Sequence, residues 1–150
     1  MLTLRFLLGA IAAALITPAA TAQEMPVFYV TDGTAMSGYD VVSYFNGDAP
    51  VHGQPKYAVV WKGAQWHFAT AENRDAFERD PRAFAPQFGG YCAYAMAHGS
   101  LVSTDPKAWQ VVDGRLYLTH SPEIEAMWRE ARTEYIRMAE AHWPVILYEQ

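Results

Sequence analysis

Cysteine is almost absent from this chain: Cys92 is the only one among 150 residues. A lone thiol cannot form an internal disulfide, so this side chain is packing material, a reactive group or a ligand of a metal ion. If the protein performs chemistry of its own, Cys92 is the first residue through which we expect that chemistry to pass.

The common catalytic signatures are absent as well. The sequence has no glycine-rich phosphate loop, no serine-hydrolase elbow and no zinc-protease helix. Neighbouring acids such as Glu123 and Glu125 fit the start of a helix, where negative charge is favourable. These observations favour a non-enzymatic role and leave an enzymatic one open.

Basic residues are few: 11 Lys and Arg stand against 16 Asp and Glu, which gives a net charge of −5. Such a balance argues against nucleic acid or an anionic membrane surface as a partner. A metal ion or a small molecule is the partner class that we expect, and the sequence specifies no protein partner. Aromatic residues make up 14% of the chain, enough for a well-filled core and an aromatic-lined pocket.

The long apolar run of a membrane span is also missing. Residues 6–16 are apolar but too short to cross a bilayer, and residues 20–22 (ATA) fit a cleavage site before Gln23. We expect residues 1–22 to be a cleaved signal peptide, which predicts a periplasmic or secreted protein without a stable membrane anchor. The alternative is an uncleaved anchor.

No internal repeat or long linker divides the rest, which we expect to form one domain. Lys62-Gly63 and Asp113-Gly114 each lie between two β-like runs, a pattern typical of tight hairpin turns. The fold class predicted is α+β: a small antiparallel sheet from two β-hairpins, packed by short helices and a long C-terminal helix. The predicted limits are an N-terminal segment at 23–36, a domain at 37–143 and a tail at 144–150.

Helical patterns occur in four segments. The first is a single turn with Asp40 near its start, and the last begins at Ser121-Pro122, a cap followed by a proline. Thr70 caps the second, and Gly99 ends the third. The predicted ranges are 39–45, 71–80, 91–97 and 121–143.

Several motifs resemble those of the YHS-domain family. Residues 38–45, GYDVVSYF, are similar to its G-Y-D-P-V-A-Y-F opening, with Val41 and Ser43 in place of proline and alanine. Residues 66–73, WHFATAEN, and residues 85–93, APQFGGYCA, continue the similarity, which covers about residues 37–143. The family resembles TRASH-type cysteine modules, so the resemblance implies heavy-metal sensing or transport. One cysteine does not make a closed zinc site, which needs four N or S ligands.

The candidate metal ligands are Cys92, Met96 and His98. If 91–97 is helical, Cys92 lies in the first turn, where the helix dipole favours a thiolate, and Met96 shares its face at i+4. With His98 beyond the helix end, such a set suits copper(I) or another soft metal ion. The ordinary alternatives are a buried cysteine, a core methionine and a surface histidine.

Four further residues are candidates for a pocket: Asp40, Tyr44, Tyr91 and His67. Asp40 and Tyr44 share a face at i, i+4, although Asp40 also suits a helix cap and the tyrosines also suit a core.

Three functions therefore remain open. The first is binding or handling of a soft metal ion through Cys92, which needs another ligand near the sulfur. The second is thiol redox or peroxide-response chemistry, which needs an exposed, acidic thiol. The third is a small-ligand or partner-binding module with a structural Cys92, which predicts a buried sulfur and an aromatic pocket elsewhere.

Overall fold

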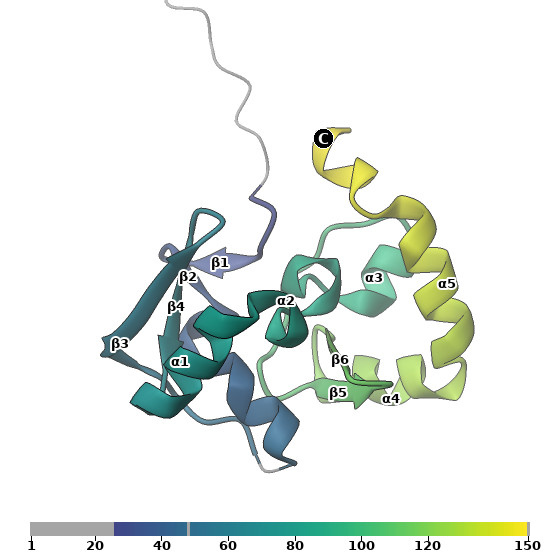
Figure 1. Cartoon of the computed structure of the whole chain (residues 1–150). Coiled ribbons are helices and arrows are strands. Elements are labelled where there is room, and N and C mark those ends of the chain that lie inside the picture. The colour runs from purple at the N-terminus through teal and green to yellow at the C-terminus, as the bar shows by residue number, and fades with distance from the viewer. Residues whose placement is uncertain (1–25, 48, 150) are drawn as a thin grey trace, which may run out of the picture.

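The computed structural model describes residues 26–47 and 49–149, and they form an α+β fold of two lobes (Figure 1). The fold class predicted from the sequence is confirmed. The predicted signal peptide, residues 1–22, lies outside the described residues. Within the described part of the chain, no helix is both long and apolar enough to cross a membrane.

The N-terminal lobe contains a four-stranded sheet in the order β1-β2-β4-β3. Lys62-Gly63 connects β3 to β4 in an antiparallel hairpin, as predicted. β2 pairs with β4 in parallel, so the sheet is mixed. The strands are β1 (Val30–Thr31), β2 (Thr34–Ala35), β3 (Gln54–Trp61) and β4 (Ala64–Phe68).

Short helices pack on this sheet. The Thr70 hydroxyl accepts a hydrogen bond from the Asn73 amide at 3.1 Å, which caps α1 as predicted. Asp80 caps α2, whose first residue is Pro81. The helices are η1 (Met36–Gly38), η2 (Val41–Asn46), α1 (Ala71–Arg79) and α2 (Pro81–Phe84).

The core of the N-terminal lobe is largely aromatic. Trp66 and Phe68 point inward from β4, while Gln65 before them is exposed and His67 between them is only partly buried, which is the two-residue alternation expected of a strand. Phe77 of α1 lies against both, with ring centroids 5.0 and 5.1 Å away. These contacts fix α1 on one face of the sheet.

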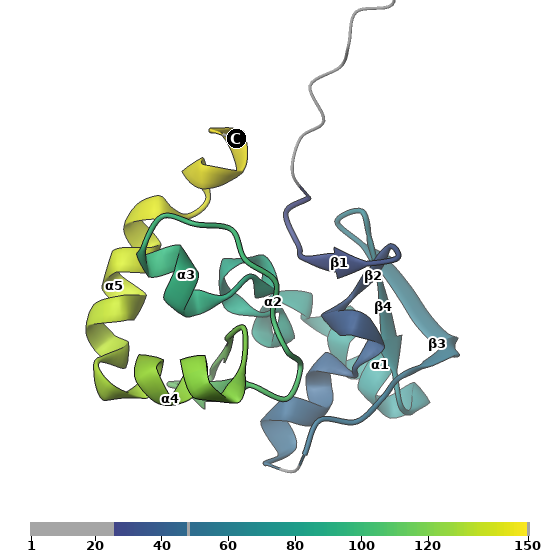
Figure 2. The same ribbon diagram turned by 180° about the vertical axis from the view of Figure 1, so that it is seen from behind.

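The C-terminal lobe is mainly helical and encloses a second core (Figure 2). Gly99 has a φ of +70° and ends α3 as predicted, because its amide and that of Ser100 bond back to Met96 and Ala95. The elements are η3 (Gln87–Gly90), α3 (Ala93–Ala97), β5 (Trp109–Val112), β6 (Arg115–Leu118), α4 (Pro122–Glu130), α5 (Arg132–His142) and η4 (Val145–Tyr148).

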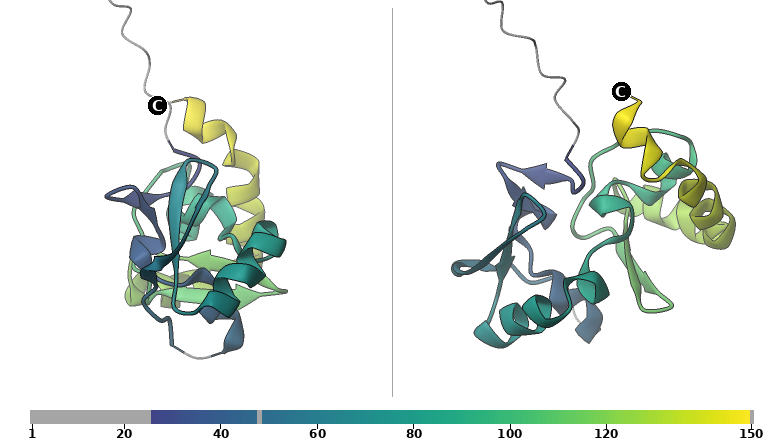
Figure 3. Two further views of the ribbon diagram at one scale, coloured as in Figure 1. Left: turned by 60° about the vertical axis from the view of Figure 1, so that its left-hand side comes forward. Right: turned by 45° about the horizontal axis from the view of Figure 1, so that its top comes forward.

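The two hairpins do not share one sheet, which corrects the prediction of a single sheet. β5 and β6 form a sheet of their own. Leu116 and Leu118 belong to the N-terminal core, whereas Tyr117 between them belongs to the C-terminal core. Because both faces of β6 are covered, the hairpin lies between the two cores instead of extending the four-stranded sheet (Figure 3).

The C-terminal helical segment predicted over 121–143 is present, with Ser121 as its cap, but it is interrupted once. Ala131 has a φ of −139° and a ψ of 37°, which separates α4 from α5. Trp128 of α4 is fully buried against Tyr117, while Tyr135 of α5 is only partly buried. The interruption lets α4 cover the hairpin while α5 runs beside α3 (Figures 1 and 2).

Both ends of the described chain pack into the fold. β1 and β2 belong to the sheet of the N-terminal lobe, and Ile146 and Leu147 of η4 are buried in the C-terminal core. The packed unit therefore extends on both sides of the predicted domain limits, 37–143.

Candidate functional site

The Cys92 side chain is buried, with only 1% of the residue exposed. It is the N-cap of α3, so the prediction that it lies in the first turn is wrong by one residue. Its amide donates to the Val102 carbonyl at 3.0 Å, and its carbonyl accepts from the Met96 amide at 2.9 Å. Within the described residues the thiol makes no hydrogen bond. The residue is held by its backbone, and its sulfur fills space.

The other two predicted metal ligands lie in different surroundings. Met96 is fully buried in the C-terminal core. His98 is exposed at the end of α3, where its ring packs against Tyr94 and Tyr135 with centroid distances of 4.8 and 5.9 Å. Across residues 26–47 and 49–149, no three His, Cys, Asp or Glu side chains lie close enough to hold a metal ion.

Asp40 is completely buried and both of its carboxylate oxygens accept hydrogen bonds. Oδ1 accepts from the amides of Val42 and Ser43 at 2.9 and 3.3 Å. Asp40 is therefore the N-cap of η2, the role that its sequence position also suits. Oδ2 accepts from the Ala69 amide at 2.8 Å and from Asn73 Nδ2 at 2.7 Å. The carboxylate joins η2, the end of β4 and α1, and it does not line a pocket.

The two candidate tyrosines also have structural roles. The Tyr44 hydroxyl donates to the Pro106 carbonyl at 2.8 Å, and the Tyr91 hydroxyl donates to the Pro26 carbonyl at 2.9 Å. Burial raises the pKa of each phenol above its ordinary value, because the low-dielectric interior disfavours the phenolate. Each hydroxyl ties together segments that are more than 60 residues apart in the sequence.

His67 lies on the outer face of β4, as its alternation with Trp66 predicts. Its Nε2 is 3.1 Å from Gln65 Oε1, and its ring borders a shallow depression with Asp32 and Ser37. The four residues predicted to line a pocket are thus in separate places, and the structure does not bring them together.

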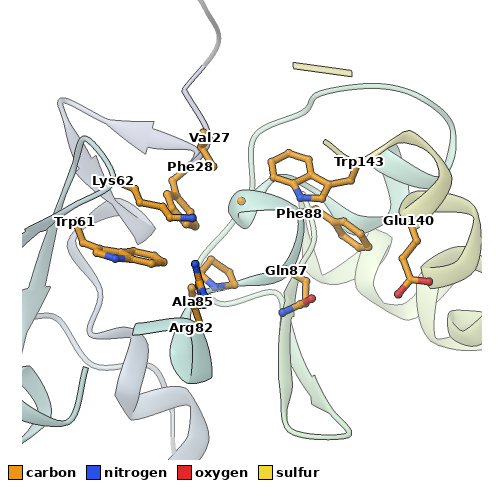
Figure 4. A pocket seen from close by; sticks show the side chains of 12 residues that line it. Val27, Phe28, Trp61, Lys62, Arg82, Ala85, Gln87, Phe88, Glu140 and Trp143 are labelled. Carbon is orange, nitrogen blue, oxygen red and sulfur yellow. The ribbon is translucent and has the colours of Figure 1, made fainter. Parts of the chain in front are cut away.

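The candidate site is instead a cleft between the two lobes, with a volume of about 290 Å³ (Figure 4). Its walls carry aromatic side chains from both cores, and three charged residues stand at its edges. None of the seven residues predicted from the sequence lines it. The aromatic and charged side chains that line it are Phe28, Trp61, Lys62, Arg82, Phe88, Glu140 and Trp143.

The aromatic walls are built by segments far apart in the sequence. On one side, Trp61 ends β3 and packs against Phe28 with ring centroids 5.3 Å apart. On the other, Phe88 of η3 meets Trp143, which follows α5, edge to face at 6.4 Å. The phenylalanines are buried, while both indoles are partly exposed. The two indoles therefore provide the apolar surface that a bound molecule can contact.

Gly89 lets the backbone segments meet between these walls. Its φ is +61°, and its carbonyl accepts a hydrogen bond from the Tyr29 amide at 2.8 Å. A Cβ atom here would lie 2.0 Å from the Val27 carbonyl oxygen and 2.8 Å from the Trp143 ring. Only glycine fits this crossing, because the position requires both a left-handed backbone and open space.

The charges of the cleft are unevenly distributed. Lys62 and Arg82 lie on the side of Trp61, and Glu140 lies on the side of Trp143 (Figure 4). Glu140 Oε1 is 3.9 Å from Arg115 Nη1, so its charge has a partner outside the cleft. The Lys62 ammonium lies 5.1 Å from the centroid of the Trp61 ring. Within the part of the chain that the structure describes, neither Lys62 nor Arg82 is paired with a carboxylate.

Reasoning from the sequence missed this cleft, although parts of it carried a signal. Phe88 and Gly89 belong to the motif at 85–93, and Lys62 is in a predicted hairpin turn. No local pattern shows that these residues face Trp143, which lies more than 50 residues further along.

The fold and the site define a two-lobed α+β protein with an aromatic cleft between its lobes. Comparison of the chain with models of protein families, with curated proteins and with solved structures gives no match.

Proposed function

We propose that this protein is a non-enzymatic binding module whose ligand, a small molecule with a flat apolar body, occupies the cleft between the lobes. The observation that carries the proposal is the pair of partly exposed indoles, Trp61 and Trp143, which face one cleft from two different cores. Ligand sites are typically concave and lined by aromatic side chains with a few polar groups. Indole rings supply a large contact area at low conformational cost.

The dimensions of the cleft limit its ligand. Its volume of about 290 Å³ is at the lower end of the range for small-molecule pockets. A single small ring system fits that space. The proposed ligand is therefore small and compact.

The surroundings of Cys92 support this function over the two thiol-based ones. Soft-metal binding needs further ligands beside the sulfur, and the nearest predicted nitrogen ligand, His98, is on the surface. Redox chemistry needs an accessible thiolate, whereas Cys92 is 1% exposed. A buried sulfur combined with an aromatic cleft elsewhere is the pattern expected of a binding module with a structural cysteine.

The test uses two probes of the same shape, naphthalene-2-carboxylate and the uncharged naphthalene-2-carboxamide. The indole N–H signals in ¹H–¹⁵N NMR report binding at each tryptophan. We expect one or both probes to shift the signals of Trp61 and Trp143 and to leave that of the buried Trp128 unchanged. Trp61→Leu is expected to weaken binding at least about tenfold, because it removes one wall.

Val60→Ala is the matched control, since Val60 neighbours Trp61 on β3 and is 75% exposed. We expect it to bind the probes as the unchanged protein does. Circular dichroism and thermal unfolding of each variant establish that it is folded. Failure of both probes to shift the Trp61 and Trp143 signals at millimolar concentration would overturn the proposed function.

A further inference from the structure

We infer that the ligand of the interlobe cleft is an aromatic carboxylate, whose ring lies between Trp61 and Trp143 and whose carboxylate is bound by Lys62 and Arg82. This inference rests on the proposed function and deepens it by naming the chemical class of the ligand. It is carried by an observation separate from the aromatic walls, namely the unpaired positive charge along one side of the cleft.

Only some of the described cations of the protein are paired with a carboxylate. Four arginines have carboxylate partners within 4.0 Å: Arg74, Arg115, Arg129 and Arg137. Arg82 has none among the described residues, and the only described interaction of Lys62 is with the Trp61 ring. Other described cations, such as Arg79 and Lys56, also lack a carboxylate partner, so what distinguishes Lys62 and Arg82 is that both line the cleft.

The single acid of the cleft lining does not neutralise them. Glu140 lies on the opposite wall, and its carboxylate is 3.9 Å from the Arg115 guanidinium. The side of the cleft formed by Trp61, Lys62 and Arg82 therefore keeps its positive charge. A ligand with one negative group at the end of an apolar ring complements both the charge and the aromatic walls.

The two cations suit a carboxylate in different ways. The planar guanidinium of Arg82 can donate two parallel hydrogen bonds to the two oxygens of a carboxylate. The Lys62 ammonium is a compact charge on a flexible stem, so it can reach the same group from the hairpin turn. Its position near the Trp61 ring places charge and apolar surface next to each other.

Phosphate fits this arrangement less well. Phosphate sites usually add several backbone N–H groups from a glycine-rich loop or from the start of a helix. The sequence has no such loop, and α2, which carries Arg82, is only four residues long.

The experiment compares the affinities of naphthalene-2-carboxylate and naphthalene-2-carboxamide at low and high salt. We expect the unchanged protein to bind the carboxylate at least about tenfold more tightly than the amide, with a difference that shrinks as salt rises. Lys62→Gln and Arg82→Gln are each expected to weaken carboxylate binding about five- to tenfold and to leave amide binding unchanged.

Two matched variants control for the loss of charge alone. Lys56→Gln removes a lysine whose ammonium lies 4.7 Å from the Tyr57 ring, the same arrangement outside the cleft. Arg79→Gln removes a neighbouring arginine of α1 that does not line the cleft. Both variants are expected to bind the carboxylate as the unchanged protein does.

The outcomes separate this inference from the proposed function. Equal affinity for carboxylate and amide overturns the inference and leaves the binding module in place. Equal weakening by the cleft variants and by their controls also overturns it, because the effect is then one of net charge. If inorganic phosphate at an equal concentration displaces the carboxylate, the cations bind an anion without any help from an aromatic ring. That result overturns the inference that the ligand is aromatic. Absence of binding by both probes overturns the inference and the proposed function together.

Discussion

At the scale of single residues, the most reactive side chains of this protein are held in the interior by hydrogen bonds or by packing. Asp40, Tyr44 and Cys92 are each at most 1% exposed. The first accepts four hydrogen bonds, the second donates one to the Pro106 carbonyl, and the third is enclosed without a described partner for its sulfur. Under the proposed function, these three side chains contribute to stability and not to binding.

Asp40→Asn is predicted to lower the free energy of unfolding by about 2–4 kcal/mol. All four partners of the carboxylate are N–H donors, so either orientation of an amide sets an NH₂ group against donors. Urea unfolding measures the loss. Asp113→Asn is the control at an exposed hairpin turn, where asparagine tolerates the φ of +50° and the change is expected to stay within about 0.5 kcal/mol. Equal stabilities of the two variants would contradict the role given to Asp40.

Replacement of Cys92 distinguishes a structural thiol from a functional one. Cys92→Ala is expected to cost about 1–2 kcal/mol through a small cavity, and Cys92→Ser about 1 kcal/mol more, because it buries a hydroxyl without a partner. Urea unfolding measures both, and neither variant is expected to change binding of the naphthalene probes. In the native protein the thiol is expected to resist an aromatic disulfide reagent. Reaction at the rate of the unfolded chain would show that the thiol is accessible.

At the scale of elements, the N-terminal segment crosses η3 at very close range. Gly89 makes this crossing possible, and the hydrogen bond from Tyr29 fixes it. The same crossing brings Phe28 and Phe88 to opposite walls of the cleft. The shape of the site therefore depends on one backbone position that has no side chain.

Gly89→Ala is predicted to lower the stability by at least about 3 kcal/mol, since strain and collision add. Gly114→Ala is the matched control, with a φ of +73° and no atom within 4 Å of its new Cβ, so it isolates the backbone strain at about 1–2 kcal/mol. Urea unfolding compares the two variants. The Trp143 indole signal is expected to shift only in Gly89→Ala, because the new Cβ meets that ring. Equal losses of stability in the two variants would show that the N-terminal segment and η3 can move apart without a measurable loss of stability.

At the scale of the whole molecule, the two cores are joined by the β5–β6 hairpin, whose strand β6 is covered on both faces. Leu116 and Leu118 face one core and Tyr117 faces the other. Tyr44 strengthens the contact between the N-terminal core and the hairpin, because its ring packs edge to face on Trp109 of β5 at 5.1 Å. We expect the lobes to unfold together, since neither can separate without exposing the hairpin.

Alkaline pH is predicted to destabilise the protein through its buried phenols. Burial raises the pKa of Tyr44, Tyr91 and Tyr117 above the ordinary 10.0, so the unfolded chain ionises first. The stabilisation is complete below pH 10 and is lost as the pH rises above it, with a slope of about 1.4 kcal/mol per pH unit for each phenol. Urea unfolding between pH 8 and pH 11 measures this decline.

Tyr44→Phe tests the assignment of the alkaline effect. We expect a loss of about 1 kcal/mol at pH 8, from the missing hydrogen bond to Pro106, and a shallower decline above pH 10. Tyr148→Phe is the control, since Tyr148 is 69% exposed, and its slope is expected to match that of the unchanged protein. An unchanged slope in Tyr44→Phe would assign the alkaline transition to other groups.

Much of the fold and little of the candidate site could be predicted from the sequence. Both hairpin turns, the caps Thr70 and Ser121 and the end of α3 at Gly99 are as predicted. The seven predicted site residues are buried structural groups or surface histidines, and none of them lines the cleft. These positions were predicted because their side chains are of chemically reactive types. Nothing in the sequence near Trp61 or Trp143 distinguishes them from other core tryptophans.

The sequence alone determined the features that depend on neighbours within a few residues. Asp113-Gly114 makes a turn because both positions accept a positive φ, and Ser121 begins a helix because its hydroxyl reaches an amide three residues on. Only the tertiary structure decided which core each face of β6 joins, that Cys92 is enclosed, and that Trp61 lies across from Trp143. Those outcomes follow from packing between segments tens of residues apart, and local periodicity carries no information about such contacts.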